Sequence, residues 1–279
     1  MAPSPVDRVP AMMDGQRRFW SNFRALASAN AAALAITVGL APVLSWLYPP
    51  TAFGYLAYFM FAFQLAIAVC TWRFDWLVPN ACSTAEEMAL LVLGGCALLL
   101  ICTALLAAVL LAPAALAAWE GYAAIGDYLF LLPVAVLGIG LRLLVSARFV
   151  RTSTLRPVSY VKIFETVGNG VLAILFGLAG VAAMGLVGAR VGASWLGIGY
   201  LLRRHSVGRA DLARLSTRRV RVVLARRFAT ATGAAGVSFF NALSIGLPIV
   251  VLGWSVSVAE LGLYLMATQL VSTPIRIGA

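Results

Sequence analysis

Apolar residues fill long stretches of the chain, and short polar segments separate these stretches. Most stretches reach about 20 residues, the length that an α-helix needs to cross the hydrocarbon core of a bilayer. A transmembrane barrel is excluded because its strands would alternate apolar with polar residues. The pattern predicts an all-α integral membrane protein of about eight transmembrane helices, at residues 25–48, 55–73, 88–112, 128–147, 160–179, 183–203, 229–253 and 258–276.

Prolines and glycines mark several ends of these helices. Pro49 and Pro50 break the chain between the first two helices, and the region of Gly177 and Gly180 forms the turn between the fifth and the sixth. Pro133 falls inside the fourth predicted helix. Because a proline in a helix interior removes a backbone hydrogen bond, we expect a kink there.

The composition agrees with a membrane protein. Of 279 residues, 62% are hydrophobic and 11% are charged, whereas soluble domains average about 25% charged residues. So few charges cannot cover a water-facing surface, and we expect no soluble globular domain. The first apolar stretch is longer than the ~7–15 residues of a signal-peptide core, which makes residues 1–24 a cytoplasmic tail before the first membrane-spanning helix.

The formal net charge of +11 would favour nucleic acid as the partner of a soluble protein. Here the basic residues lie between apolar stretches, so topology explains them and we expect no nucleic acid partner. With the N-terminus in the cytoplasm, every Lys and Arg except Arg190 falls on the inner side, and the outer connections contain none. This positive-inside pattern predicts a multi-pass protein of the cell's inner (plasma) membrane with a cytoplasmic N-terminus.

Motifs of enzymes and metal sites do not occur in the sequence: there is no HExxH, GxSxG, P-loop or paired-carboxylate motif. Three of the four cysteines lie in apolar stretches and are interpreted as small core residues. His205 lies in an arginine-rich connection, where a solvated loop residue is expected. We therefore expect no metal or other cofactor, no catalytic residue and no enzyme activity. The cysteines are Cys70, Cys82, Cys96 and Cys102.

A short pattern recurs late in the chain. Pro42 in the first helix precedes Gly54 at the start of the second, and Pro248 in the seventh helix precedes Gly262 at the start of the eighth. The prolines are 206 positions apart and the glycines 208. Six helices separate the two copies, and an even number preserves orientation, so the repeat is parallel. It predicts two six-helix lobes related by an axis along the membrane normal, a plan that transporters use.

Three parts of the chain carry a resemblance to a known family. They are residues 42–57, residues 73–79 (RFDWLVP), and residues 239–248 (FFNALSIGLP) followed by 260–264 (ELGLY). These stretches resemble the polysaccharide-biosynthesis flippases, which export lipid-linked repeat units of O-antigen, capsule or exopolysaccharide. That family belongs to the multidrug/oligosaccharidyl-lipid/polysaccharide exporter superfamily, and the match runs over nearly the whole chain.

The resemblance implies two six-helix lobes around a central cavity that opens alternately to each side of the membrane. Residues 25–203 would form the N-terminal lobe, 204–227 a basic cytoplasmic connection, and 228–279 the first two helices of the second lobe, as in a C-terminally truncated member. The implied function is transport of a lipid-linked oligosaccharide from the cytoplasmic to the outer face. The implied partners are that lipid-linked oligosaccharide diphosphate and proteins of polysaccharide polymerisation or export.

Arginines inside the membrane-spanning stretches are the first candidates for a diphosphate site, because the planar guanidinium stays charged and binds phosphate oxygens in pairs. Arg190 in the sixth helix is the first candidate, with snorkelling to the interface as the alternative. Arg142 in the inner part of the fourth helix is the second, with a cytoplasmic anchor as the alternative. Arg73 and Asp75 are expected to pair with each other, as a gate, a structural clip or a substrate contact.

Other polar residues complete the set of candidates. Glu165 is a speculative proton-coupling carboxylate, although a salt bridge with Lys162 or Arg156 is the favoured interpretation. Segment 203–227, rich in arginine, is expected to lie on the anionic membrane lipids of the inner leaflet. Several amides inside the stretches are expected to hydrogen-bond between helices, with lining a sugar cavity as the alternative. They are Asn30, Gln64, Asn169, Asn241 and Gln269.

Two other functions fit less well. A multidrug exporter of the same superfamily would share the fold, but the arginine-rich, polysaccharide-type stretches argue against it. A membrane glycosyltransferase, polymerase or ligase acting on lipid-linked sugars usually presents a large outer loop. The outer connections here are short, and their acidic residues are Glu120, Asp127 and Glu260.

Overall fold

The structure, a computed structural model, describes residues 5–111, 126–152, 156–204 and 216–278, and every regular element in these ranges is helical. The long helices are α1 (Pro5–Leu47), α2 (Pro50–Val69), α3 (Thr84–Leu111), α6 (Leu131–Arg151), α7 (Arg156–Leu178), α8 (Ala183–Arg204), α10 (Thr217–Ser255) and α11 (Val258–Gly278). Short 3-10 turns are η1 (Phe74–Trp76), η2 (Val78–Asn80) and η3 (Gly126–Tyr128).

These helices have the length and composition of membrane spans. Within the described ranges, seven of them are long and apolar enough to cross a membrane, including Ala27–Leu47 of α1. In α11, the described apolar part is the shorter segment Val258–Thr268. The predicted fold class, an all-α membrane protein of about eight helices, is confirmed.

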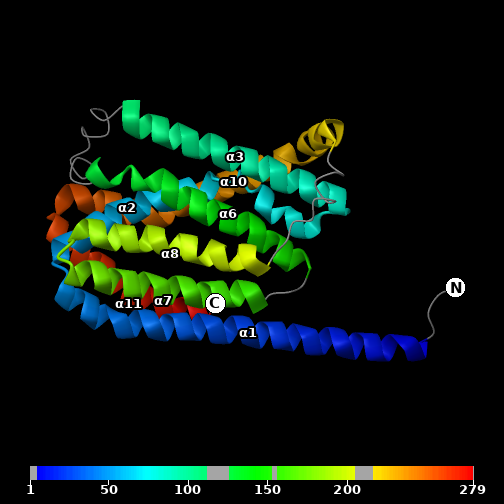
Figure 1. The fold of residues 1–279 in the computed structure, drawn as a ribbon, viewed down its shortest axis with the longest axis horizontal. Helices are drawn as coiled ribbons and strands as arrows, with labels where there is room; N and C mark the ends of the chain where they lie inside the picture. The colour runs from blue at the N-terminus through cyan, green and yellow to red at the C-terminus, as the bar shows by residue number, and fades with distance from the viewer. Residues whose placement is uncertain (1–4, 112–125, 153–155, 205–215, 279) are drawn as a thin grey trace.

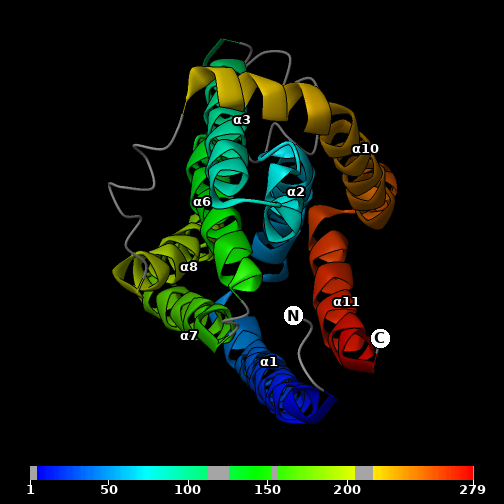
Figure 2. The ribbon, with the colours of Figure 1, turned by 90° about the vertical axis from the view of Figure 1, so that its right-hand side faces the viewer.

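The long helices run side by side and alternate in direction along the chain, as Figure 1 shows. Helix α7 packs between α1 and α8, α6 packs against α8 and α3, and α2 packs against α10 and α11. Figure 2 shows the first part of α10 lying across the start of α3, and the rest passing beside α2. Because the direction alternates, α10 runs parallel to α1, and α11 runs parallel to α2 (Figure 1).

The largest buried cluster lies where α2, α3, α6 and α8 meet. Phe59, Leu98, Val136 and Val187 are almost completely buried there. Large apolar side chains such as Trp254 remain exposed, as expected of helices whose outer faces lie in lipid. Without a hydrophobic force between helices in a bilayer, close packing of small residues holds such bundles together.

Several helix starts differ from the prediction: α1 begins at Pro5 rather than 25, and α2 begins at Pro50 rather than 55. Helix α10 begins at Thr217 rather than 229, so the last part of the predicted basic connection is the amphipathic start of this helix. Pro133 is the third residue of α6, which begins at Leu131. The first four backbone N–H groups of a helix have no partner inside it, so Pro133 costs no hydrogen bond, and the kink expected there is wrong.

A reciprocal contact joins the first turns of α2 and α11. Gly54 packs against Val258, the first residue of α11, and Gly262 packs against Pro50, the first residue of α2. Each glycine is the fifth residue of its helix, and a Cβ on either one would collide with the backbone of the other helix. A contact that maps onto itself when two elements are exchanged indicates a local two-fold relation. Since α2 and α11 run in the same direction, the axis lies along the helices, as the parallel repeat requires.

Candidate functional site

Three charged side chains on neighbouring helices form what we call the α6–α8 charge cluster: Arg142 of α6, Glu165 of α7 and Arg190 of α8. The Arg142 Nε lies 2.8 Å from Glu165 Oε1, and both side chains are largely buried. Arg190 is close enough to interact electrostatically with both partners. All three lie within helices long enough to span the membrane, so the sequence candidates Arg190, Arg142 and Glu165 are brought together.

The packing of α7 on α8 makes room for the carboxylate of this cluster. Gly197 of α8 lies directly against Glu165, where an added Cβ would stand 2.8 Å from Glu165 Cγ. Gly168 and Gly192 likewise receive leucine side chains of the opposite helix. Small residues thus let Glu165 lie close against α8, on which α6, the helix of Arg142, also packs.

The expected salt bridge of Glu165 with Lys162 or Arg156 is wrong. The ion pair of Glu165 is with Arg142, and Lys162 acts on it only at longer range. Lys162 Nζ instead donates a hydrogen bond to Asn30 Oδ1 of α1 at 2.5 Å. Asn30 therefore forms an interhelical hydrogen bond, as expected, and this bond ties α7 to α1.

The cluster carries more positive than negative charge. Arg142 is neutralised by Glu165, whereas Arg190 has no ion-pair partner within hydrogen-bonding distance among the described residues. The Arg190 side chain is exposed at the surface. A charge inside a membrane-spanning region is costly unless it faces water or a counter-ion. This arrangement can hold an anion.

The expected pairing of Arg73 with Asp75 is wrong. Trp72 and Arg73 both adopt a left-handed backbone, with φ of 50° and 57°, and this turn sends the two side chains to different partners. The buried Asp75 accepts a hydrogen bond from Thr71 Oγ1 at 2.5 Å. The Arg73 guanidinium lies 4.5 Å from the centre of the Trp76 ring, in the geometry of a cation–π contact. We assign this segment a local structural role.

The remaining amide candidates are not hydrogen-bonded to the α6–α8 charge cluster in the part of the chain that the structure describes. Gln64 and Asn241 are exposed and Asn169 is partly buried, and among the described residues no hydrogen bond links them to the cluster. The side chain of Gln269 lies outside the described residues. The role of these amides as sugar ligands stays a prediction.

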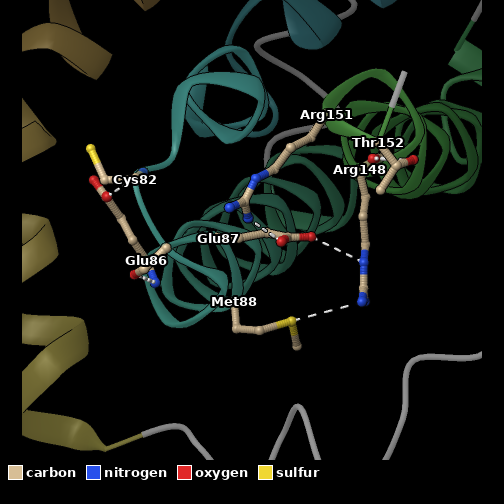
Figure 3. A network of polar contacts seen from close by, with 8 residues as sticks. Cys82, Glu86, Glu87, Met88, Arg148, Arg151 and Thr152 are labelled. Carbon is tan, nitrogen blue, oxygen red and sulfur yellow. Dashed lines mark hydrogen bonds and ion pairs between the residues drawn. The ribbon is translucent and has the colours of Figure 1, made fainter. Parts of the chain in front are cut away.

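The candidate residues from the sequence did not include a second group of charges, which we call the α3 ion-pair layer. Glu87 at the start of α3 is buried between Arg148 and Arg151 of α6, as Figure 3 shows. The Arg148 Nε lies 3.0 Å from Glu87 Oε1. Glu86 receives the Nε and Nη2 of Arg227 from α10, at 3.0 Å and 2.9 Å. The layer thus joins α3 to α6 on one side and to α10 on the other.

The sequence held a signal for this layer. Ser83 and Glu86 have the spacing of a helix-capping box, and the structure shows a related cap. The Glu86 backbone N–H donates to Ser83 Oγ, and Glu86 Oε2 accepts from the N–H of Cys82, one residue before the N-cap. An acidic pair in the first turn of a helix, in a chain whose connections are rich in arginine, predicts ion pairs at that end of the bundle.

Comparisons with known proteins do not assign this chain to a family. No protein-family model, curated protein or solved structure matches the chain. The functional interpretation therefore depends on the charge cluster, the helix arrangement and the sequence stretches described above.

Proposed function

We propose that this membrane protein carries a lipid-linked oligosaccharide diphosphate from the cytoplasmic to the outer face of the inner membrane, by alternating access. The observation that carries the proposal is the α6–α8 charge cluster, whose Arg190 is exposed and lacks a carboxylate of its own. The stretches that resemble the polysaccharide-biosynthesis flippases point to the same substrate class. The proposal includes a cytoplasmic N-terminus and a transport role rather than enzyme activity.

The chemistry of such a substrate matches the cluster. A lipid diphosphate presents several oxygens with negative charge, and guanidinium groups bind such oxygens through paired, charge-assisted hydrogen bonds. Arg142 is held in place by Glu165, so Arg190 can turn toward a diphosphate while the sugar lies in water and the tail stays in lipid. The same positive excess disfavours the organic cations that a multidrug exporter would carry.

The helix arrangement supports movement of one group of helices against another. The reciprocal glycine contact of α2 and α11 fits two lobes related by an axis along the membrane normal, and rocking of such lobes is a common route to alternating access. At the inner end, Glu86 on α3 holds Arg227 on α10. In this proposal the Glu86–Arg227 ion pair closes the inner side and breaks when the lobes part there.

Binding to the purified chain tests the proposal without requiring a full transport cycle. The chain is placed in lipid nanodiscs, and its Kd for a polyprenyl-diphosphate oligosaccharide is measured. Loss of a charge-assisted hydrogen bond costs about 1.5–3 kcal/mol, so Arg190→Ala should weaken binding by roughly tenfold to a hundredfold. The Kd of Arg190→Lys should lie between those of wild type and Arg190→Ala, because lysine keeps the positive charge but lacks the planar guanidinium that binds two oxygens at once.

Arg203→Ala is the matched control, since Arg203 is an exposed arginine near the inner end of the same helix. It should leave the Kd unchanged. A Kd that is the same for wild type and Arg190→Ala, with both proteins folded, would overturn the proposed site. Saturable binding of a lipophilic cation, in place of the lipid diphosphate, would favour the multidrug exporter.

A further inference from the structure

A hollow of about 420 Å³ lies between the start of α3 and the start of α10. The first part of α10 lies across the start of α3 (Figure 2). Its walls come from both helices and from the residues just before α3. They are Cys82, Ser83, Glu86, Arg219, Val222, Val223, Arg226 and Arg227.

The walls of this hollow carry an excess of positive charge. Three arginines face one carboxylate, and that carboxylate, Glu86, is occupied by Arg227. Arg226 is exposed and makes no ion pair with any residue that the structure describes. The hollow therefore offers guanidinium groups to an anion, and its hydroxyl donor Ser83 lies on the opposite wall.

The position of the hollow relates it to the membrane surface. The basic start of α10 ends at Arg227, and the apolar stretch follows at once with Phe228, whose side chain is exposed. Val222, which lines the hollow, is also exposed. Polar walls beside exposed apolar side chains match the boundary where lipid headgroups meet acyl chains, and a basic pocket at such a boundary suits a phosphate headgroup.

We propose that this hollow binds the phosphate of an anionic phospholipid of the inner leaflet. Arg226 contacts the phosphate oxygens, Arg219 and Arg227 add to the positive field, and the acyl chains lie along Val222 and Phe228. This site is separate from the α6–α8 charge cluster, and it does not depend on the transported substrate.

Cys82 supplies a native reporter for this site. It lines the hollow and its side chain is exposed, whereas Cys70 and Cys102 are buried and Cys96 lies on the apolar part of α3. The rate at which a neutral, water-soluble maleimide labels Cys82 is measured by peptide mass spectrometry. The protein is held in nanodiscs of phosphatidylcholine alone, or of phosphatidylcholine with phosphatidylglycerol. Cys82→Ser identifies the background.

We expect phosphatidylglycerol to slow labelling of Cys82 several-fold, and Arg226→Gln to abolish most of that protection. Arg221→Gln is the matched control, because Arg221 is an exposed arginine of the same helix that does not line the hollow. It should keep the protection, although it removes the same charge from the membrane surface. Arg226→Lys should keep part of it.

Several results would overturn the proposal. Equal labelling rates in both nanodiscs would show that no anionic lipid enters the hollow. Equal loss of protection in Arg226→Gln and Arg221→Gln would show a general surface-charge effect. Protection by free inorganic phosphate in phosphatidylcholine nanodiscs, matching that by phosphatidylglycerol, would assign the hollow to a soluble anion instead of a lipid.

Discussion

Charged side chains form two groups in this bundle, and the groups differ in how their positive and negative charges pair. In the α6–α8 cluster, Glu165 pairs with Arg142, and Arg190 has no ion pair among the described residues. In the α3 ion-pair layer, Glu87 is buried against Arg148 and Arg151. Removing water from charges costs several kcal/mol per ion, so the buried Glu87 depends on its two partners.

Replacing Glu87 by Gln should destabilise the protein. The change removes the carboxylate that pairs with two largely buried arginines, and breaking such a buried pair costs about 3 kcal/mol. Thermal unfolding in detergent would show it as a lower melting temperature. As a control, Glu260→Gln should change little, because Glu260 is exposed and its cap to the Ser257 N–H can be kept by an amide oxygen. Equal melting temperatures for wild type and Glu87→Gln would contradict this account of the α3 ion-pair layer.

The sequence indicated some of these residues and not their partners. Arg190 and Arg142 could be picked out because a charge inside an apolar stretch is unusual. That Arg142 meets Glu165 depends on the rotation of α6 and α7 about their axes, which no single-sequence pattern determines. The pairing of Arg73 with Asp75 failed because two residues in left-handed conformation turn the chain after α2.

At the scale of the helices, hydropathy located the membrane-spanning parts well and their polar extensions poorly. Helix α10 continues toward its N-terminus through an arginine-rich segment that hydropathy assigned to a connection. This segment packs its apolar side, including the buried Val223, in a cluster with Phe74 and Leu90. Pro133 was similarly misjudged, since its effect depends on where α6 begins.

The packing of α2 on α11 makes a sharp prediction for two glycines. Gly54→Ala and Gly262→Ala should each destabilise the protein by about 1–3 kcal/mol, the cost of overpacking a close contact, and by similar amounts because the contact is reciprocal. Gly39→Ala in α1 is the matched control. Nothing lies within 4 Å of the position that its Cβ would take, so alanine should be neutral or stabilising by about 0.5–1 kcal/mol.

Melting temperatures of the three variants would check this prediction. A large effect of Gly54→Ala together with none of Gly262→Ala would contradict the local two-fold relation. A loss of stability in Gly39→Ala as large as in the other two would show that glycine flexibility matters here, and the close contact does not.

For the whole molecule, the fold class and the order of the helices could be predicted from the sequence. The physical reason is that a bilayer leaves few choices, because each apolar stretch must form a helix and cross. The repeat of Pro42 and Gly54 in Pro248 and Gly262 also had a visible trace, since the prolines are 206 positions apart and the glycines 208. The face-to-face position of the two copies could not be read from spacing, since it depends on how α2 and α11 meet in space.

The central claim is that this protein moves a lipid-linked oligosaccharide diphosphate between leaflets, and a translocation assay tests it most directly. Vesicles that contain the purified chain carry a fluorescent polyprenyl-diphosphate oligosaccharide in both leaflets, and a membrane-impermeant glycosidase is added outside. We predict that wild-type protein carries the inner-leaflet substrate outward, so that the glycosidase cleaves it. With Arg190→Ala, as in vesicles without protein, the inner-leaflet substrate should stay uncleaved. Inner-leaflet substrate that stays protected in wild-type vesicles would contradict the claim.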